Sequence, residues 1–401
     1  MDGRSPSPRR RSRGFTASSL ELFAGAGGLA LGLHQAGFRP IALLERERNS
    51  CDTLRMNLNA LGGGTVPPRV IQSDIREIDY SEFVGRVRFV SGGPPCQPFS
   101  LGGRHWGRDD DRDMFPEAVR AVRELRPDAF LFENVRGLLR KSFSEYFGYV
   151  LLQLSYPEVP ARNGETWQDH RRRLESRRAS RSRCDLEYDV CFRQVNAADY
   201  GVPQARHRVA IVGFRSGLGA GWSFPEPTCA REALAREKAD GGAYWQEHGL
   251  LPPRTGHAPR PAGIPAGCAP RRWRTVRDAL AGLPDPRFDA QAEFANHEFR
   301  DGARRYKGHS GSVLDEPSKA LKAGVHGVPG GENSVSLDDG SLRYYTAREG
   351  ARLQTFPDSY VFSGSWSESM RQIGNAVPVL LARAIGASVA SVLGKAEELH
   401  G

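Results

Sequence analysis

Hydrophobic positions in residues 18–214 fall into short runs that are separated by amphipathic stretches. Short apolar runs are typical of buried strands, and the stretches between them repeat at helical spacing. The pattern predicts strands at Leu20–Phe23, Ile41–Leu44, Val70–Ile71, Val87–Val90, Ala129–Phe132 and Val209–Phe214, and helices at Gly28–Ala36, Asn49–Leu61 and Met114–Leu125. Strands that alternate with helices favour an α/β fold with a doubly wound, mostly parallel sheet.

This regularity ends near Arg215, where Gly, Pro, His and Arg become frequent and helical periodicity fades. We expect a second, less regular domain there, with an extended stretch over Pro252–Pro270. An apolar helix over Pro378–Leu393 should close the chain, with Pro378 in its first turn. The expected organisation is a disordered basic tail at 1–17, one domain formed by 18–214 and 367–401, and a smaller domain at 215–366.

One segment interrupts the order of strands and helices. Seven arginines fall between Arg171 and Arg183. We interpret this stretch as an inserted helix or loop with a charged face, and its composition favours a solvated surface over a dedicated nucleic-acid contact.

The charge balance points weakly to a polyanionic partner. The formal net charge is +9, from 56 Lys and Arg against 47 Asp and Glu. Such a balance suits a nucleic acid, and it also suits a basic surface that only keeps the protein in solution. The six cysteines form no pair with zinc spacing, so we expect no metal site and reduced thiols in a cytosol. No apolar run is long enough to predict a membrane span.

The run Phe23–Gly28 follows the first expected strand and precedes the first expected helix. Its glycines allow a ligand to approach the backbone closely. Glu45 ends the second strand, where a carboxylate commonly binds the hydroxyls of a ribose. These features predict a nucleoside cofactor, with NAD and S-adenosylmethionine both open and a tight turn without a ligand as the alternative.

A second group of chemical side chains lies at the ends of later strands. Asp74 ends the third strand, where it could meet an adenine amino group or cap the next helix. Cys96 stands in a Gly-Pro-rich turn, which exposes a thiol better than a buried strand does, and a deprotonated thiol is strongly nucleophilic. Glu133 ends another strand. Since open α/β sheets bind ligands at the carboxyl edge, the sequence predicts one site there.

Together these residues resemble the DNA (cytosine-5)-methyltransferase family, in its bacterial restriction–modification form, from Leu20 to about Gly394. The motifs occur in the order usual for the family. They are Phe23–Gly28 for the cofactor loop, Pro95-Cys96-Gln97 for the nucleophile, Glu133-Asn134-Val135 for the acid, Gln204–Arg208 for the Gln-x-Arg-x-Arg motif, Thr346–Pro357 for the ninth motif and Gly374–Pro378 for the last.

The resemblance implies a Rossmann-like catalytic domain that binds S-adenosylmethionine, and a target recognition domain at 215–366. It implies a reaction on a cytosine flipped out of double-stranded DNA. Cys96 would add to carbon-6, and Glu133 would hold N3 and the exocyclic amine. Arg206 and Arg208 would orient the base and backbone. Residues 101–113 would form a mobile loop that closes over the DNA.

Contacts are implied residue by residue. Cofactor contacts fall on Phe23, Ala24, Gly25, Gly27, Gly28, Glu45, Arg46, Asp74, Ile75, Pro95, Asn375 and Val377. DNA contacts fall on Gln97, Ser100, Arg112, Gln204, Lys319, Lys322 and His326. Family members often have Thr where this chain has Ala320, which puts one backbone contact near the flipped base in doubt.

Three other readings stay open at this point. The chain could methylate cytosine in RNA, as one branch of the family does, although the long recognition segment and the Pro-Cys-Gln turn favour DNA. It could be a silent DNA-binding protein that keeps the fold, against which stand Cys96, Glu133, Arg206 and Arg208. An NAD-dependent oxidoreductase would leave the Pro-Cys-Gln turn unexplained. We expect a cytoplasmic, nucleoid-associated monomer that is functionally paired with a restriction endonuclease.

Overall fold

The computed structural model describes residues 17–62, 66–95, 113–180, 185–239, 242–252, 270–288, 293–305, 310–323 and 333–400. Expectations for the N-terminal tail, for residues 101–112 and for most of the Pro252–Pro270 stretch lie outside these residues.

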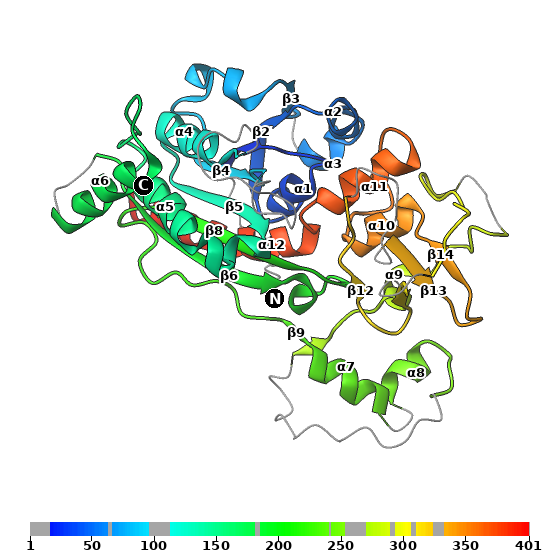
Figure 1. Ribbon diagram of the computed structural model, residues 1–401. Helices are drawn as coiled ribbons and strands as arrows, with labels where there is room; N and C mark the ends of the chain where they lie inside the picture. Colours follow the sequence, from blue (N-terminus) through cyan, green and yellow to red (C-terminus); the bar gives the residue numbers. More distant parts are fainter. Residues whose placement is uncertain are drawn as a thin grey trace, which may run out of the picture.

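A seven-stranded sheet organises the larger part of the protein, in the order β3-β2-β1-β4-β5-β8-β6 (Figure 1). Its strands are β1 (Ala17–Leu22), β2 (Phe38–Glu45), β3 (Arg69–Gln72), β4 (Phe89–Gly92), β5 (Ala129–Val135), β6 (Tyr188–Asn196) and β8 (His207–Arg215). The pairs from β3 to β5 are parallel, and β8 is antiparallel to both of its neighbours. The chain moves outward from β1 to β3 and then returns to place β4 on the other side of β1. Such a switch point creates a crevice at the carboxyl ends of the strands.

Alternation along the strands supplies apolar side chains to both faces of the sheet. Phe130 and Phe132 belong to a core shared with α4 (Phe115–Leu125) and α5 (Ser144–Ser155). Leu131 belongs to a second core shared with α1 (Gly28–Gln35) and α12 (Val379–His400). Helices therefore cover both faces, as the doubly wound reading predicts.

The helical run Trp366–Lys395 is long and apolar enough to cross a membrane by length and composition. Its apolar residues have another explanation in this fold. Leu381, Ile385, Val389 and Leu393 are buried in the core that α12 shares with α1 and the sheet. Helix α12, which forms most of this run, is therefore a core helix of a globular unit.

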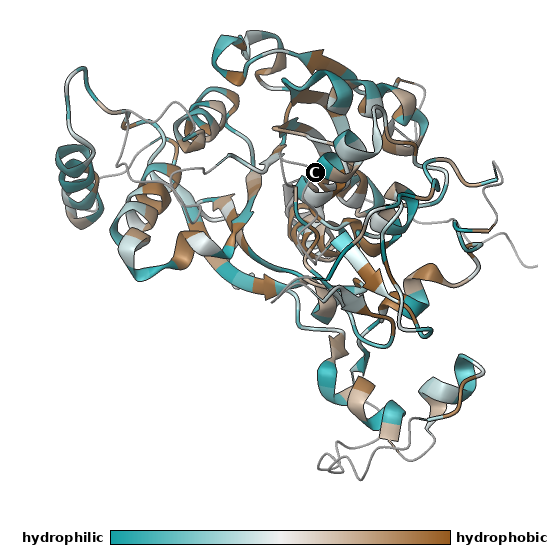
Figure 2. Ribbon diagram, turned by 45° about the vertical axis from the view of Figure 1, so that its right-hand side comes forward, coloured by the Kyte–Doolittle hydropathy of each residue, from teal (hydrophilic) through white to brown (hydrophobic). Residues whose placement is uncertain are grey.

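The remaining α-helices and short strands lie outside the seven-stranded sheet. They are α2 (Arg48–Met56), α3 (Leu58–Gly62), α6 (Trp167–Ser180), β7 (Gln204–Ala205), β9 (Cys229–Ala230), α7 (Arg231–Lys238), α8 (Ala243–Glu247), β10 (Arg271–Arg272), α9 (Val276–Leu280), β11 (Ser312–Val313), β12 (Ser318–Lys319), β13 (Ser334–Ser336), β14 (Leu342–Tyr344), α10 (Ala347–Leu353) and α11 (Trp366–Asn375). Helices α7 and α8 project away from the sheet as a small lobe (Figure 1). The Arg-rich insertion is largely the helix α6, which stands at the left edge and is mostly hydrophilic (Figure 2).

Two features differ from the sequence-based expectation. The single helix expected over Asn49–Leu61 is broken at Asn57, whose side-chain amide donates to the carbonyls of Thr53 and Val361, both at 2.7 Å. Helix α5 and strand β6 were not predicted. Both carry apolar and polar residues in mixed order, because each packs on the core along only one side.

The domain boundary expected at residue 366 remains a prediction. One apolar core includes Tyr345, Leu353 and Phe356 from the expected recognition domain together with Leu31 and Leu43 from the sheet side. The two expected units therefore share a continuous interior at this place.

Candidate active site

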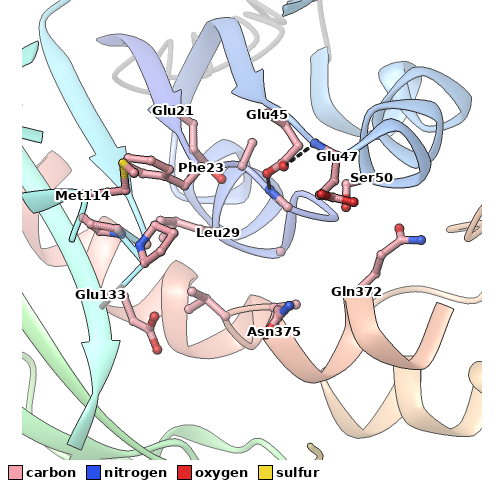
Figure 3. A pocket seen from close by; sticks show the side chains of 18 of the residues that line it. Glu21, Phe23, Leu29, Glu45, Glu47, Ser50, Met114, Glu133, Gln372 and Asn375 are labelled. Atoms are coloured by element: carbon pink, nitrogen blue, oxygen red, sulfur yellow. Dashed lines mark hydrogen bonds between the residues drawn. The ribbon is translucent and has the colours of Figure 1, made fainter. Parts of the chain in front are cut away.

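A cavity of about 670 Å³ opens at the switch point of the sheet, in the range of small-molecule sites (Figure 3). Segments far apart in the sequence form its walls: the loop after β1, the ends of β2 and β5, the turns after β3 and β4, and the junction of α11 with α12. Among the expected site residues, those that line it are Phe23, Ala24, Gly25, Gly28, Glu45, Arg46, Asp74, Ile75, Pro95, Glu133, Arg206, Arg208, Asn375 and Val377.

The loop after β1 presents its backbone to the cavity. Phe23 and Gly25 both have φ near 54°, in the left-handed region that glycine tolerates and phenylalanine rarely adopts. A Cβ added to Gly25 would meet no atom of the described residues within 4 Å, so the space that they leave beside it is open to a ligand. The strained Phe23 is held in this conformation by the surrounding structure, as often occurs at binding sites.

Gly27 and Gly28 serve the packing of this loop. A Cβ on Gly28 would lie 2.3 Å from the carbonyl oxygen of Val377, so the loop and the C-terminal segment touch through backbone. Gly27 does not line the cavity, and a Cβ there would collide with Leu54 and the Tyr360 hydroxyl. The packing of the loop therefore requires glycine at position 27, and the cofactor contact expected for Gly27 stays a prediction.

Backbone amides hold the carboxylate of Glu45. One oxygen accepts a hydrogen bond from the Gly25 N–H at 2.8 Å, and the other accepts from the N–H groups of Arg46 and Glu47, both at 2.8 Å (Figure 3). This arrangement ties the end of β2 to the glycine loop and fixes a carboxylate at the cavity wall.

Asp74 has one of the two roles that its sequence position left open, the helix cap, and the adenine contact stays a prediction. Its carboxylate caps a short 3-10 helix by accepting from the Arg76 N–H at 3.0 Å, and it lines the cavity. The hydrogen bonds from the Arg76 side chain, with a more distant contribution from Arg46 at 3.7 Å, hold the pKa of Asp74 well below its usual range. The carboxylate therefore stays ionised.

The turn after β4 is held next to the acid at the end of β5. The Asn134 side chain donates to the Pro94 carbonyl at 2.9 Å, and the Met114 N–H donates to the Pro95 carbonyl at 3.2 Å. A Cβ added to Gly93 would lie 3.7 Å from a carboxylate oxygen of Glu133. Cys96 itself, with Gln97, Ser100 and Arg112, lies outside the described residues.

Glu133 and Arg208 form an ion pair inside the cavity, with Nε 2.6 Å from Oε1. Both side chains are mostly buried, at 13% and 14% exposed. Burial raises the pKa of Glu133, and the positive charge of Arg208 opposes that rise. A carboxyl in this setting can hold a proton more readily than one in water.

Arg206 has a different environment from Arg208, although both were expected to orient the substrate. It is 1% exposed, and its terminal nitrogens donate to the backbone carbonyls of Leu321, Gly374 and Ala376. Burial lowers its pKa. Its two Nη groups therefore hold protein backbone and are not directed at a ligand.

Gln204 lies in the protein interior, and the DNA contact expected for it stays a prediction. Its side chain is 0% exposed, and the amide bonds to Leu321 N, to Leu353 O and to the side chain of Gln354. The two lysines of the same expectation, Lys319 and Lys322, have exposed side chains. His326 lies outside the described residues.

Sequence reasoning missed several residues that line the cavity, among them Glu21, Arg371 and Gln372. Glu21 is 3% exposed on β1, accepts from the Ser91 hydroxyl at 3.3 Å, and has a pKa that burial raises to about 8. Arg371 and Gln372 precede the last motif directly. A carboxylate within the apolar run Leu20-Glu21-Leu22 was the available signal for Glu21.

The family comparison decides what this cavity belongs to. The model of the C-5 cytosine-specific DNA methylase family matches residues 17–156, 163–239 and 288–391. This chain is a member of that family. It transfers a methyl group from S-adenosylmethionine to carbon-5 of cytosine in DNA. The unmatched residues 240–287 include α8 of the projecting lobe.

Curated relatives and solved structures agree with this assignment. The Type II methyltransferase M.PspPI of Psychrobacter sp. (strain TA137) is 32% identical over 94% of this chain and 80% of its own. M.NgoMIV of Neisseria gonorrhoeae is 30% identical over 94% of this chain and 98% of its own. The Dnmt2 methyltransferase of S. pombe, at 17% identity, covers 95% of this chain and 99% of its own with a TM-score of 0.55, which supports the fold.

Proposed function

We propose that the methyltransferase works through a covalent adduct of Cys96, with Glu133 and Arg208 as the groups that hold the flipped cytosine. The observation that carries this proposal is the ion pair of Glu133 with Arg208, in the same cavity as the glycine loop and beside the turn that leads into Cys96. A stacked base cannot reach such a cavity, so the cytosine must leave the duplex.

The chemistry follows from the residue types. The Cys96 thiolate adds to carbon-6, and the ring electrons move toward N3, which takes a proton from Glu133. Arg208 keeps Glu133 in place and faces the base. Carbon-5 is then electron-rich and takes the methyl group that the sulfonium of the cofactor supplies. Solvent takes the carbon-5 proton, the electrons of that bond expel the Cys96 sulfur as a thiolate, and the N3 proton returns to Glu133, which releases 5-methylcytosine.

One end of the cavity, formed around Gly25, Glu45 and Asp74, fits a nucleoside, and we call it the cofactor end. Gly25 leaves open space where any side chain would stand, and the fixed Glu45 carboxylate lies next to it. We assign the ribose hydroxyls to Glu45, the adenine to Asp74 and Ile75, and the methionyl part to Asn375 and Val377. The remaining contacts of the cofactor end fall on Phe23, Ala24, Gly28, Arg46 and Pro95, which line the same cavity.

We assign double-stranded DNA to the face that carries Lys319 and Lys322, together with the segment that contains Gln97, Ser100 and Arg112. Exposed cations there suit phosphate oxygens. The relatives are Type II methyltransferases. We therefore infer that this enzyme protects host DNA beside a restriction endonuclease, as a cytoplasmic monomer associated with the nucleoid.

Mechanism-based trapping tests the covalent step. Duplex DNA with 5-fluorocytosine at the target should become attached to the wild-type protein, because fluorine cannot leave as a proton does. Cys96→Ala should abolish both attachment and methylation while DNA binding persists. Cys191→Ala, a change at a partly buried thiol that does not line the cavity, is the matched control and should keep both. Turnover by Cys96→Ala would overturn the assignment.

The target is found by bisulfite sequencing of DNA from cells that express the chain. Parallel assays of methyl incorporation into duplex DNA and into transfer RNA show which of the two polymers is the substrate. Incorporation only into RNA would contradict the DNA assignment.

A further inference from the structure

Arg206 joins two segments that are distant in the sequence. Its Nη1 donates to the Leu321 carbonyl at 3.0 Å, and its Nη2 donates to the carbonyls of Gly374 at 2.5 Å and Ala376 at 3.2 Å. We call residues 318–323 the recognition segment and residues 374–377 the cofactor turn. One buried guanidinium thus connects both to the strand that carries Arg208.

The two segments also touch each other directly. A Cβ added to Gly374 would lie 2.6 Å from the carbonyl carbon of Lys322 and 2.7 Å from the nitrogen of Ala323. Contacts this short mean that only glycine allows the two backbones to approach. The recognition segment cannot shift toward the cofactor turn without moving it.

Side-chain amides fix each segment in place. Asn333 accepts from the Lys322 N–H and donates to the Lys322 carbonyl, both at 2.9 Å. Gln354 donates to the carbonyls of Ile373 at 2.6 Å and Ala376 at 3.1 Å. Gln204 donates to the Gln354 side chain and accepts from Leu321, so it closes the network between them.

Each segment contains residues that we assign to a different ligand: the cofactor turn to S-adenosylmethionine, and the recognition segment to DNA. Asn375 and Val377 of the cofactor turn line the cavity. Lys319 and Lys322 of the recognition segment have exposed side chains. The Arg206 network is the shared support between the two.

We propose that Arg206 is a positioning residue that couples cofactor binding to DNA binding, by fixing the recognition segment against the cofactor turn. This inference rests on the cofactor and DNA contacts proposed above. A ligand that orders one of these segments then lowers the free-energy cost of ordering the other segment. Because such coupling is a free energy between two sites, each ligand raises the affinity for the other by the same factor.

The experiment measures that factor in both directions. Fluorescence anisotropy gives the Kd of the cognate duplex with and without saturating S-adenosylhomocysteine, and calorimetry gives the Kd of S-adenosylhomocysteine with and without the duplex. In the wild type we expect each ligand to lower the Kd of the other by about fivefold or more. The product analogue avoids turnover, so the readout is independent of activity.

Arg206→Lys keeps the charge but cannot reach three carbonyls with a planar fork, so the coupling factor should fall toward one. Asn333→Ala loosens the recognition segment without touching the cavity and should act in the same direction. Arg348→Lys is the matched control. Arg348 is also fully buried and also donates to three backbone carbonyls, those of Ala295, Pro357 and Tyr360, outside this network.

Thermal unfolding is followed for every variant, so that loss of fold is not mistaken for loss of coupling. The inference holds if Arg348→Lys loses stability but keeps the coupling factor, while Asn333→Ala and Arg206→Lys lose it. It is overturned if Arg206→Lys or Asn333→Ala, folded at the assay temperature, keeps the wild-type factor. A direct contact of Arg206 with the base would instead lower kcat with unchanged coupling, which also overturns it. Failure of the wild type to methylate duplex DNA would refute the proposed function, a separate result.

Discussion

The cavity has two ends: the cofactor end around Glu45, and the base end around Glu133, where we place the flipped cytosine. The two ends stabilise their carboxylates in different ways. At the cofactor end, Glu45 accepts hydrogen bonds from three backbone N–H groups of nearby residues. At the base end, Glu133 pairs with the charged side chain of Arg208, which comes from a strand much later in the chain. Backbone donors fix the position of the Glu45 carboxylate, whereas burial raises the pKa of Glu133 and the positive charge of Arg208 opposes that rise.

Glu21 has a third kind of environment, in which burial dominates. It lies on β1 between the two ends, buried, with the Ser91 hydroxyl as its side-chain donor (Figure 3). Burial raises its pKa to about 8. Three of the carboxylates that line the cavity therefore form a series, from Glu45, which is bound by backbone amides, through Glu133, which pairs with a cation, to Glu21, whose pKa is raised by burial.

The largest effect should come from the base end. Glu133→Gln keeps the shape but removes the group that exchanges a proton with N3. We expect kcat to fall by about 10²- to 10⁴-fold, the usual contribution of a positioned acid–base group. The Kd for S-adenosylmethionine should stay unchanged. Single-turnover kinetics and calorimetry measure the two quantities.

Glu117→Gln is the control for this change, because Glu117 pairs with Arg120 on α4 and does not line the cavity. A weakened cofactor affinity in Glu133→Gln would mean that the two ends are not separate sites.

The second effect is the pH dependence of stability that Glu21 creates. Its folded-state pKa of about 8 lies above the value of 4.5 for an unperturbed glutamate. The protonated form is therefore favoured in the folded state, so its stabilising contribution is complete below pH 4.5 and is lost as the pH rises through 8. Glu21→Gln removes this dependence. At about 1.36 kcal/mol per unit, the difference between the proteins should change by roughly 3–5 kcal/mol from pH 4.5 to pH 8.

Denaturant unfolding across that pH range gives the comparison, with Glu232→Gln as the control at an exposed carboxylate on α7. Parallel stability curves for wild type and Glu21→Gln would show that Glu21 is ionised throughout, and the series of three carboxylates would be incorrect.

The cofactor end should give the third effect. Glu45→Gln exchanges one acceptor oxygen for a donor, so one backbone N–H and a ribose hydroxyl lose their partner. Hydrogen bonds to a charged group contribute about 1.5–3 kcal/mol, so the Kd for S-adenosylmethionine should rise about 10- to 100-fold. At saturating cofactor, kcat should stay within about twofold, because a uniform binding loss affects KM. A fall in kcat equal to that of Glu133→Gln would contradict the division of the cavity.

Local signals in the sequence predicted one end of the cavity better than the other. Glycines after a strand and a carboxylate at the end of the next strand form a local pattern in the sequence. In the structure, the Gly25 N–H donates a hydrogen bond to the Glu45 carboxylate. The Gln-x-Arg-x-Arg motif gave no such guidance. Gln204, Arg206 and Arg208 occur at alternate positions, yet only Arg208 reaches Glu133, while the other two bind segments more than a hundred residues later. Burial of that kind depends on tertiary packing, which spacing does not reveal.

The smallest effect should come from the ion pair of Arg371 with Glu47, at 3.2 Å, since both residues line the cavity and Glu47 follows the cofactor carboxylate closely. Glu47 is half exposed at 47%, and such pairs contribute about 0.2–1 kcal/mol. Arg371→Gln should raise the Kd for S-adenosylmethionine only about two- to fivefold, as measured by calorimetry. The increase should be smaller at high salt. Arg352→Gln, which breaks the pair with Asp358 away from the cavity, should leave the affinity unchanged. A loss of about 50-fold or more in Arg371→Gln would show that a cation binds the ligand directly, and the cofactor end would then depend on charge as the base end does.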